Sequence, residues 1–439
     1  MNIRTAAVRI LNSYHHQYFN YENRITAMAD RLQLSEKDRD FLYLLVKGVI
    51  LHRLYLDHVI EIASQRSVSK FENTVLNLLR VGVFQYLILE TPPHAFTNET
   101  VEAAKQLKKP RAAGLINGIL RHLPSKDDLE TRFSKLPDNA SLAIRYSHPQ
   151  WMINRWIENF GIENTQIIAD FNNSYQKIYF RHNPVKISWE NLFQLLKDSG
   201  YAITVATDSP IIFFSTDTPG ELIRSELFTN GFMSVQDISQ SLAVRLLNPQ
   251  PGETIIDACA APGGKTGMIA QLAGRESIVH AYDISADKVI LLKNEAFRLG
   301  LDFVNYGVAD ARSGTFPLAD KVLLDVPCSG TGVMARRADL RWNRTPQDLQ
   351  TLRIMQREIL TNMISVVKPG GVLVYSTCSI EPEENWQNIE WFLKENQDFT
   401  IENADNFVEA KWCDKNGAVQ VLPHFHNETG GFAVRLQKR

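Results

Sequence analysis

The chain has 439 residues, 44% hydrophobic and 22% charged, which is typical of globular proteins and excludes a disordered, collagen-like or coiled-coil chain. One hydrophobic core rarely serves so long a chain, so we expect two or three domains. The formal net charge of -2 excludes a uniformly basic protein that coats nucleic acid nonspecifically, and any RNA contact must use a local basic patch.

Cysteine usage and the N-terminal stretch indicate the compartment. The few cysteines form no C-x-x-C pair and are too widely spaced for a small disulfide scaffold, which favours reduced thiols. Charged residues interrupt the N-terminal stretch, so it lacks the apolar segment of a signal peptide, and no window reaches the length of a membrane span. We therefore expect a cytoplasmic protein without membrane contact. Cys413, His424 and His426 fit no common zinc spacing, so we expect no metal.

The first part of the chain, to about residue 125, has apolar residues at helical spacing throughout. Ser35 and Asp38 form the capping box that starts one helix, and Pro92-Pro93 stops another. Helices are expected near residues 35–51 and 74–89, from 97 or 98 onward, and near 115–123. This pattern predicts an all-α bundle.

The next part changes character. Residues 126–149 are polar and proline-broken, which predicts a linker in which short helical turns can occur. After a helix near 151–160, a strand, a helix and two strands are expected near residues 178–182, 189–199, 203–206 and 211–214. Such a run predicts a small sheet with helices on one side, a unit that many RNA-binding proteins use.

From about residue 236 the pattern becomes strand, turn, helix, repeated. Strands are expected near residues 254–258, 278–283, 303–308, 321–325 and 371–376. The alternation predicts a doubly wound Rossmann-like α/β domain, in which ligands bind outside the carboxyl ends of the parallel strands. We thus expect a helical domain (1–130), a linker with a small α+β subdomain (131–235) and an α/β domain (236–439).

The run D-A-C-A-A-P-G-G-K-T, residues 257–266, follows the first of these strands. Small residues and glycines let a ligand approach the backbone at the start of a helix. A phosphate loop is excluded, because its first glycine would be residue 259, which is Cys259. Asp283 and Asp310 end the next two strands, where a carboxylate can accept ribose hydroxyls. Either aspartate alone could equally be a turn residue, but with the glycine turn they predict an adenosine-sized pocket.

Two cysteines follow two further strands, Cys328 in D-V-P-C-S-G-T-G and Cys378 in Y-S-T-C-S. A lone cysteine is usually a small buried hydrophobic residue, but a pair directed at one crevice favours reactive thiols. One reaction that needs such a thiol is methylation of cytosine at carbon 5. That carbon becomes nucleophilic only after a thiolate adds to carbon 6, and a carboxylate must then share a proton at N3. Asp325 is placed for that role, whereas spacing leaves the roles of the two cysteines interchangeable.

These motifs resemble the cytosine-5 RNA methyltransferase family, known for its bacterial Sun and eukaryotic nucleolar members. The resemblance spans roughly residues 231–431 and includes several motifs in the same order. Besides the runs already quoted they are V-Q-D at 235–237, L-R-W at 340–342, K-P-G-G at 368–371 and E-E-N at 383–385. Val326 departs from the family's usual alanine, and R-R-A-D-L-R-W at 336–342 replaces a more usual histidine-proline form.

The resemblance implies a role for each site residue. Cys378 would be the nucleophile, Cys328 would assist release of the methylated product, and S-adenosylmethionine would be the cofactor. The residues implied to line the cofactor and base pocket are Cys259, Ala260, Ala261, Pro262, Gly263, Gly264, Lys265, Asp283, Asp310 and Asp325.

The N-terminal helices resemble the NusB antitermination factor, with G-L-I-N-G-I-L-R at 114–121. Together with the methyltransferase motifs they resemble the branch of the family that modifies one cytosine of small-subunit (16S) ribosomal RNA, and we expect a monomer. The alternatives are the same chemistry on tRNA or large-subunit rRNA, or a catalytically silent RNA-binding or antitermination factor. Candidate basic patches are Lys105, Lys108, Lys109, Arg111 and Arg121, and Arg336, Arg337, Arg341 and Arg344.

Overall fold

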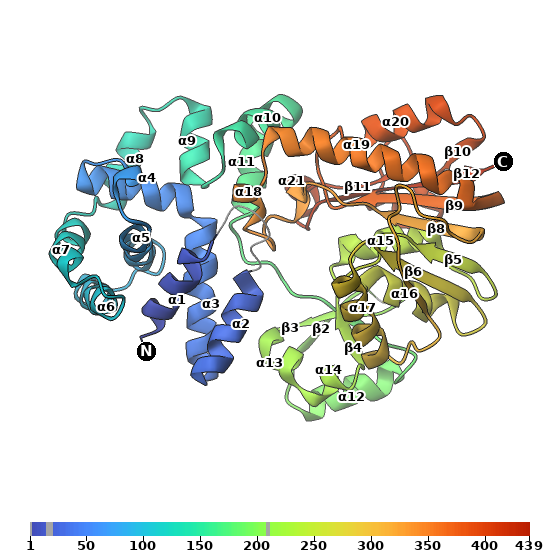
Figure 1. Cartoon of the computed structure of the whole chain (residues 1–439), viewed down its shortest axis with the longest axis horizontal. Helices are drawn as coiled ribbons and strands as arrows, with labels where there is room; N and C mark the ends of the chain where they lie inside the picture. The colour runs from blue at the N-terminus through green and yellow to red at the C-terminus, as the bar shows by residue number, and fades with distance from the viewer. Residues whose placement is uncertain (1, 15–20, 208–210) are drawn as a thin grey trace. The chain divides into compact units, whose positions relative to one another are not determined.

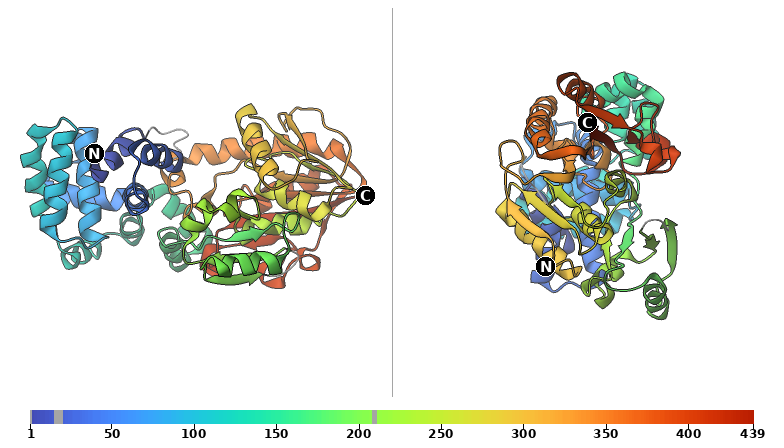
Figure 2. Two further views of the ribbon diagram at one scale, coloured as in Figure 1. Left: turned by 90° about the horizontal axis from the view of Figure 1, so that it is seen from below. Right: turned by 90° about the vertical axis from the view of Figure 1, so that its right-hand side faces the viewer.

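The computed structural model describes residues 2–14, 21–207 and 211–439. They form two compact units, whose helices and strands are drawn in Figures 1 and 2. The helical unit comprises Met1–Ser174 with Met334–Arg344, and the sheet unit comprises Tyr175–Val333 with Thr345–Arg439.

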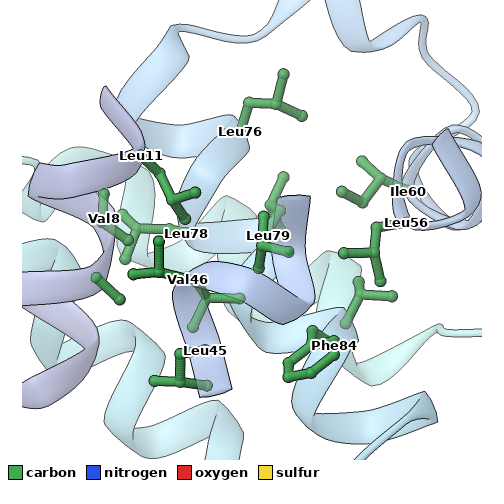
Figure 3. Close-up of a cluster of buried hydrophobic side chains, with 14 of the residues drawn as sticks. Val8, Leu11, Leu45, Val46, Leu56, Ile60, Leu76, Leu78, Leu79 and Phe84 are labelled. Carbon is green, nitrogen blue, oxygen red and sulfur yellow. The ribbon is translucent and has the colours of Figure 1, made fainter. Parts of the chain in front are cut away.

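The helical unit confirms the predicted all-α bundle. Its elements are α1 (Ile3–Asn12), α2 (Tyr21–Leu32), α3 (Glu36–Leu51), α4 (Arg53–Ser64), α5 (Asn73–Leu87), α6 (Pro93–Gln106), α7 (Ala113–Arg121), α8 (Lys126–Phe133), α9 (Asp138–Arg145), α10 (Gln150–Phe160), α11 (Ile162–Phe171) and α18 (Leu340–Asn343). Helix α5 is buried along nearly its whole length, so apolar residues occur all around it. Figure 3 shows its Leu78, Leu79 and Phe84 packed among side chains of α1, α3 and α4.

Two stretches differ from the sequence-based expectation. Helix α6 begins at Pro93 rather than at 97 or 98, because a proline suits the first helical turn, where a backbone N–H would have no helical partner. The expected linker contains helices α8 and α9, and Ser125 with Asp128 forms a capping box that starts α8. Leu129 and Phe133 of α8 are buried in the bundle, so the boundary predicted between residues 130 and 131 lies inside this helix.

Close packing of α3 on α5 depends on Gly48, and this gives a stability prediction. A Cβ at Gly48 would collide with the ring of Phe84, so Gly48→Ala should lower the free energy of unfolding by about 1–3 kcal/mol. Urea unfolding followed by circular dichroism measures it. The control is Gly118→Ala in α7, where a Cβ meets open space and the better helix former should raise stability by up to about 1 kcal/mol. Equal stability of the two variants would contradict the packing.

The segment Met334–Arg344, inserted in the chain between β8 (Ala319–Asp325) and α19 (Pro346–Met363), is anchored in the helical unit by Arg341. The Arg341 side chain is 0% exposed, and its guanidinium donates to the carbonyl oxygens of Leu51 (2.9 Å), Ser147 (3.1 Å) and Asn172 (3.1 Å). The indole of Trp342 donates to the carbonyl of Ile50 at 2.7 Å. The prediction that Arg341 belongs to an RNA-contacting patch is therefore wrong, because its guanidinium is buried and donates hydrogen bonds to backbone carbonyls.

The sheet unit begins with the predicted small sheet. Its elements are β1 (Phe180–His182), α12 (Trp189–Asp198), β2 (Ile203–Thr207), β3 (Phe213–Thr216), α13 (Pro219–Arg224), α14 (Glu226–Thr229) and β4 (Met233–Val235). The strand order is β2-β3-β1-β4, with antiparallel pairing. Leu192 and Leu196 of α12 pack on Phe180 and Phe214. Strand β4, which pairs with β1, is an addition to the predicted elements.

The large sheet confirms the predicted doubly wound domain. Its strands are β5 (Thr254–Asp257), β6 (Ile278–Asp283), β7 (Asn305–Val308), β8 (Ala319–Asp325), β9 (Val367–Thr377), β10 (Phe399–Glu402), β11 (Val419–Val421) and β12 (Gly431–Lys438). The order is β10-β12-β9-β8-β5-β6-β7, with β11 on β12; β5 to β9 are parallel, and β10 to β12 form antiparallel pairs. The order reverses between β5 and β8, where a ligand crevice is expected.

Helices cover both faces of this sheet (Figure 1). They are α15 (Ile238–Leu247), α16 (Gly264–Ala273), α17 (Ala286–Arg298), α19 (Pro346–Met363) and α20 (Trp386–Glu395). Ile255 and Ile256 of β5 point to opposite faces: Ile255 packs with side chains of α15, α16 and α17, and Ile256 with those of α19 and α20. Burial on both faces explains the continuous apolar runs of the central strands. Over the part of the chain that the structure describes, no helix has the length and apolar character needed to cross a membrane.

Candidate active site

The glycine turn joins β5 to α16 at the carboxyl end of the sheet. Gly263 has φ +111°, which favours glycine, and it caps the N-terminus of α16. The amide of Ala260 donates to the carbonyl of Tyr282 at 2.8 Å and so fastens the turn to β6. Asp257 is 1% exposed and accepts a hydrogen bond from Thr266 at 2.7 Å. Burial raises the pKa of Asp257 to about 7, against the lowering by the Thr266 hydroxyl.

The two aspartates that follow the next strands differ in their surroundings. Asp283 ends β6, is 5% exposed, and one of its oxygens accepts from the amide of Ser285 at 3.1 Å. Asp310 lies beyond β7, and Arg312 clasps its carboxylate, with Nη2 at 2.6 Å from Oδ2. The hydrogen bonds from Arg312 outweigh desolvation and lower the pKa of Asp310. The Ala309 amide donates to the carbonyl of Asp283 at 3.1 Å, so the loops after β6 and β7 adjoin.

The two predicted cysteines face each other at the ends of β8 and β9. The Sγ atoms of Cys328 and Cys378 are 3.1 Å apart, both cysteines are half-buried, and neither is in a disulfide. The hydrogen bond between the thiols lowers the pKa of Cys378 and outweighs burial and the Asp325 carboxylate, which raise it, while the Lys265 ammonium adds to the lowering. The same hydrogen bond, together with burial, raises the pKa of Cys328 well above its usual value. The pair therefore favours a Cys378 thiolate that accepts the Cys328 S–H.

A half-buried cation, Lys265, joins the glycine turn to the end of β8. The Nζ of Lys265 lies 2.8 Å from Oδ2 of Asp325 and 2.8 Å from Oε1 of Gln240. Burial alone would lower the pKa of Lys265, but the Asp325 carboxylate outweighs it and raises that pKa. The hydroxyl of Ser376 donates to the other oxygen of Asp325 at 2.8 Å. Asp325 is therefore a fixed carboxylate beside the sulfur pair.

A buried polar network holds the two cysteine loops and centres on Glu384. The carboxylate of Glu384 accepts from the Ser329 amide (2.9 Å), the Ser329 hydroxyl and the Gln356 amide (2.9 Å). The Ser379 hydroxyl lies 3.1 Å from the Ser329 hydroxyl, and the Gly332 amide donates to the carbonyl of Cys378 at 3.0 Å. Satisfied buried networks of this kind keep side chains in one arrangement, so the sulfur separation is held by structure on both sides.

Arg181 links the small sheet to the glycine turn. It lies on β1, is 0% exposed, and donates to the carbonyl of Gly264 at 2.7 Å and to the side chain of Gln236. Burial lowers the pKa of Arg181 to about 9. Its Nε and Nη2 have no hydrogen-bond partner among the described residues. The carbonyl side of the turn is therefore supported by a residue from a sheet far away in the sequence.

Family models match most of the chain. The model described as 16S rRNA methyltransferase RsmB/F matches residues 244–437, that of the NusB family matches 1–124, and that of a ferredoxin-like domain of RsmF/B-like methyltransferases matches 148–212. Ribosomal RNA small subunit methyltransferase B of Escherichia coli O1:K1 / APEC is 35% identical to this chain, over 100% of this chain and 99% of that protein. The chain belongs to the ribosomal RNA small subunit methyltransferase B family.

Further similarities agree with this membership. A curated protein of Bacillus subtilis (strain 168) is 32% identical, over 93% of this chain and 92% of that protein. The crystal structure of PH0851 is 25% identical and has a TM-score of 0.81, covering 99% of both chains. The family assignment confirms the resemblance to Sun-type methyltransferases and to NusB.

In this methyltransferase B family member, most residues of the cluster were predicted from the sequence, but the residues that support them were not. The structure brings together Cys328 with Cys378 and Lys265 with Asp325, and both members of the ion pair act on the Cys378 thiol. Asp310, by contrast, is held by Arg312 of its own loop. The supporting residues that were missed are Gln240, Ser376, Gln356, Arg181 and, within the quoted E-E-N motif, Glu384. Among the described residues, no group of three or more histidine, cysteine, aspartate or glutamate side chains could hold a metal ion.

The thiol pair predicts selective alkylation in this family member. Iodoacetamide at about pH 7 should modify Cys378 before Cys328, because the thiolate is the reactive form and the pKa of Cys378 is the lowered one. Mass spectrometry of the tryptic peptides measures the order. Cys413, whose pKa burial raises, is the internal control and should also react more slowly. Raising the pH should narrow the difference in alkylation rate between Cys378 and Cys328. Faster alkylation of Cys328 than of Cys378 would contradict the assigned directions of their pKa shifts.

Proposed function

We propose that this chain transfers a methyl group from S-adenosylmethionine to carbon 5 of a cytosine in small-subunit (16S) ribosomal RNA, through a covalent bond between Cys378 and carbon 6. The observation that carries the proposal is the sulfur pair at 3.1 Å beside the Lys265–Asp325 ion pair at 2.8 Å. A nucleophile with a lowered pKa next to a held carboxylate is what addition to an electron-poor pyrimidine requires. The family's ribosomal RNA methyltransferases support the choice of substrate.

The residues at the carboxyl end of β5 and β6 fit the cofactor. The positive φ of Gly263 opens the backbone at the N-terminus of α16, and one oxygen of buried Asp257 has no partner among the described residues. Asp283 would receive the ribose hydroxyls, and residues 259–264 would lie along the nucleoside. Asp310 would contribute at the rim, beside Arg312. S-adenosylmethionine supplies an electrophilic methyl group when it is bound.

The protein's part in the first step is addition. The Cys378 thiolate attacks carbon 6, a carbon–sulfur bond forms, and the electrons of the C5–C6 double bond move toward N3. As negative charge develops at N3, that atom takes a proton that passes through Asp325 from the Lys265 ammonium, whose Nζ lies 2.8 Å from Oδ2 of Asp325. Ser376 fixes its other oxygen. Carbon 5 is then a nucleophile.

The second step for the protein is release. The proton leaves carbon 5 to solvent water, its bonding electrons restore the C5–C6 double bond, Cys378 departs as a thiolate, and N3 returns its proton through Asp325 to Lys265. Cys328 is assigned to this step because its sulfur lies 3.1 Å from the departing one.

We also retain the sequence-based expectations of a cytoplasmic monomer, and of helical and α+β segments that bind RNA.

Transfer of labelled methyl groups tests the proposal. The chain is incubated with tritiated S-adenosylmethionine and, separately, with small-subunit rRNA, large-subunit rRNA and tRNA, and the product is then mapped by bisulfite sequencing. Label at one bisulfite-resistant cytosine of the small-subunit rRNA is the expected result. Label on tRNA or large-subunit rRNA instead would mean that this RNA, and not small-subunit rRNA, is the substrate. Label at an atom other than carbon 5 would overturn the proposed chemistry. Absence of label on every RNA would favour a catalytically silent RNA-binding factor.

A further inference from the structure

The helical unit contains a polar pocket apart from the candidate active site. It has a volume of about 300 Å³ and is lined by residues of α1, α3, α4, α5 and α18. Two aromatic rings, Tyr14 and Trp342, line it together with Arg53, the first residue of α4. This pocket is large enough for a nucleobase with its sugar and is not part of the methyl-transfer chemistry.

Arg53 is the feature of the pocket that points to an anion. Its guanidinium carbon lies 5.4 Å from the centroid of the Trp342 ring and 5.8 Å from that of Tyr14. Among the described residues it makes no hydrogen bond and no ion pair. The neighbouring carboxylate of Asp57 is already used, because both its oxygens accept from Arg80, at 2.6 and 2.7 Å. The pocket therefore keeps one uncompensated positive charge with free N–H donors.

The rest of the pocket wall is a preorganised set of amides. Asn77 is 2% exposed, accepts from Arg80 at 2.9 Å and donates to the side chain of Asn12 at 2.9 Å. Asn12 in turn donates to the Thr74 hydroxyl at 3.0 Å. These side chains are held before any ligand arrives, so little rotamer freedom is lost on binding. Amide groups, an arginine and aromatic rings together are the groups that recognise single-stranded RNA bases and their phosphates.

We propose that this pocket binds one unpaired nucleotide of the RNA substrate, with a phosphate on Arg53 and the base against the rings of Tyr14 and Trp342. The inference rests on the proposed function for the identity of the ligand as RNA. It adds a contact at the helical unit that selects RNA with an unpaired nucleotide and holds it during the reaction.

Binding measurements on the full chain test the pocket. Arg53→Gln should weaken binding of transcribed small-subunit rRNA about tenfold, and should reduce the slope of log K against log salt by roughly 0.7, the value for one phosphate of a single strand. The matched control is Arg66→Gln, which removes the same charge from an exposed residue outside the pocket and should change affinity by less than about twofold. Equal effects of the two substitutions overturn the proposal.

Photo-crosslinking of the unmodified chain gives a second readout that needs no folded variant. RNA carrying 4-thiouridine should crosslink to peptides that contain Tyr14 or Trp342, and crosslinks confined to other peptides would overturn the proposal. Methylation of the same RNA is scored in parallel. If the RNA is methylated but Arg53→Gln and Arg66→Gln bind it with equal affinity, the pocket proposal is refuted and the proposed function stands. Binding that is sensitive to Arg53 without methylation refutes the proposed chemistry and supports the pocket.

Discussion

Replacing Cys378 with alanine is expected to reduce methyl transfer to small-subunit rRNA by at least about 10⁴-fold. In the proposed reaction, no bond to carbon 6 can form without this sulfur, and carbon 5 would stay too electron-poor to accept a methyl group. Cys328 is not expected to substitute, because burial and the carboxylates of Glu384 and Asp325 still raise its pKa when the Cys378 thiol is absent. Transfer of tritium from labelled cofactor under single-turnover conditions measures the loss.

Cys413→Ala is the matched control for this prediction. Cys413 belongs to the same unit, is half-buried, and its thiol lies 3.7 Å from the carbonyl of Glu409 rather than at the strand ends. Its replacement should leave methyl transfer within about twofold of the unmodified chain. Thermal unfolding of both variants separates loss of chemistry from loss of fold. Retained activity in Cys378→Ala would refute the covalent route.

The large sheet could be predicted from sequence because its information is local. Each parallel strand is a short apolar run followed by a turn and a helix, and chemistry was expected at the strand ends for that topology alone. Cys328 and Cys378 are 50 residues apart in the chain, yet both follow strands, so their meeting was predictable. Their two roles were not, since spacing carries no information on pKa.

Features that depend on contacts with residues far away in the chain could not be predicted from the sequence. Arg341 reads as part of a basic cluster, and only the carbonyls of Leu51, Ser147 and Asn172 reveal it as a buried anchor. Helix α8 is mostly polar in sequence, with burial restricted to Leu129 and Phe133, so its pattern looked like a linker. Strand β4 is too short to have a periodicity and exists through its pairing with β1.

The residues that hold the site in place could not be predicted for the same reason, because their partners are distant in the sequence. Glu384 lies in the E-E-N motif at 383–385, but its hydrogen bonds reach Ser329 and Gln356, on two other segments. Lys265 was placed on the cofactor turn, and its ion pair with Asp325 spans 60 residues. These contacts matter because a Lys265–Asp325 pair that is already held in place costs no reorganisation when it supplies a proton to a developing negative charge.

Replacing Cys328 with alanine is expected to trap the reaction as a covalent complex of protein and RNA, since Cys378 can still add to carbon 6 while the release step lacks its thiol. Incubation with small-subunit rRNA and S-adenosylmethionine should give a slowly migrating band on a denaturing gel that ribonuclease removes. Turnover should fall by about a hundredfold or more, because general acid–base assistance is worth about that much. The double variant Cys328→Ala, Cys378→Ala should form no such band.

The pH dependence of trapping distinguishes this role from a structural one. In Cys328→Ala the hydrogen bond that lowers the pKa of Cys378 is absent, so that pKa should rise. A higher pKa means less thiolate near pH 7, so the adduct should form more slowly there and faster as the pH rises past the new value. Loss of packing alone would slow trapping at every pH. A band from Cys378→Ala, and none from Cys328→Ala, would reverse the assignment of the two sulfurs.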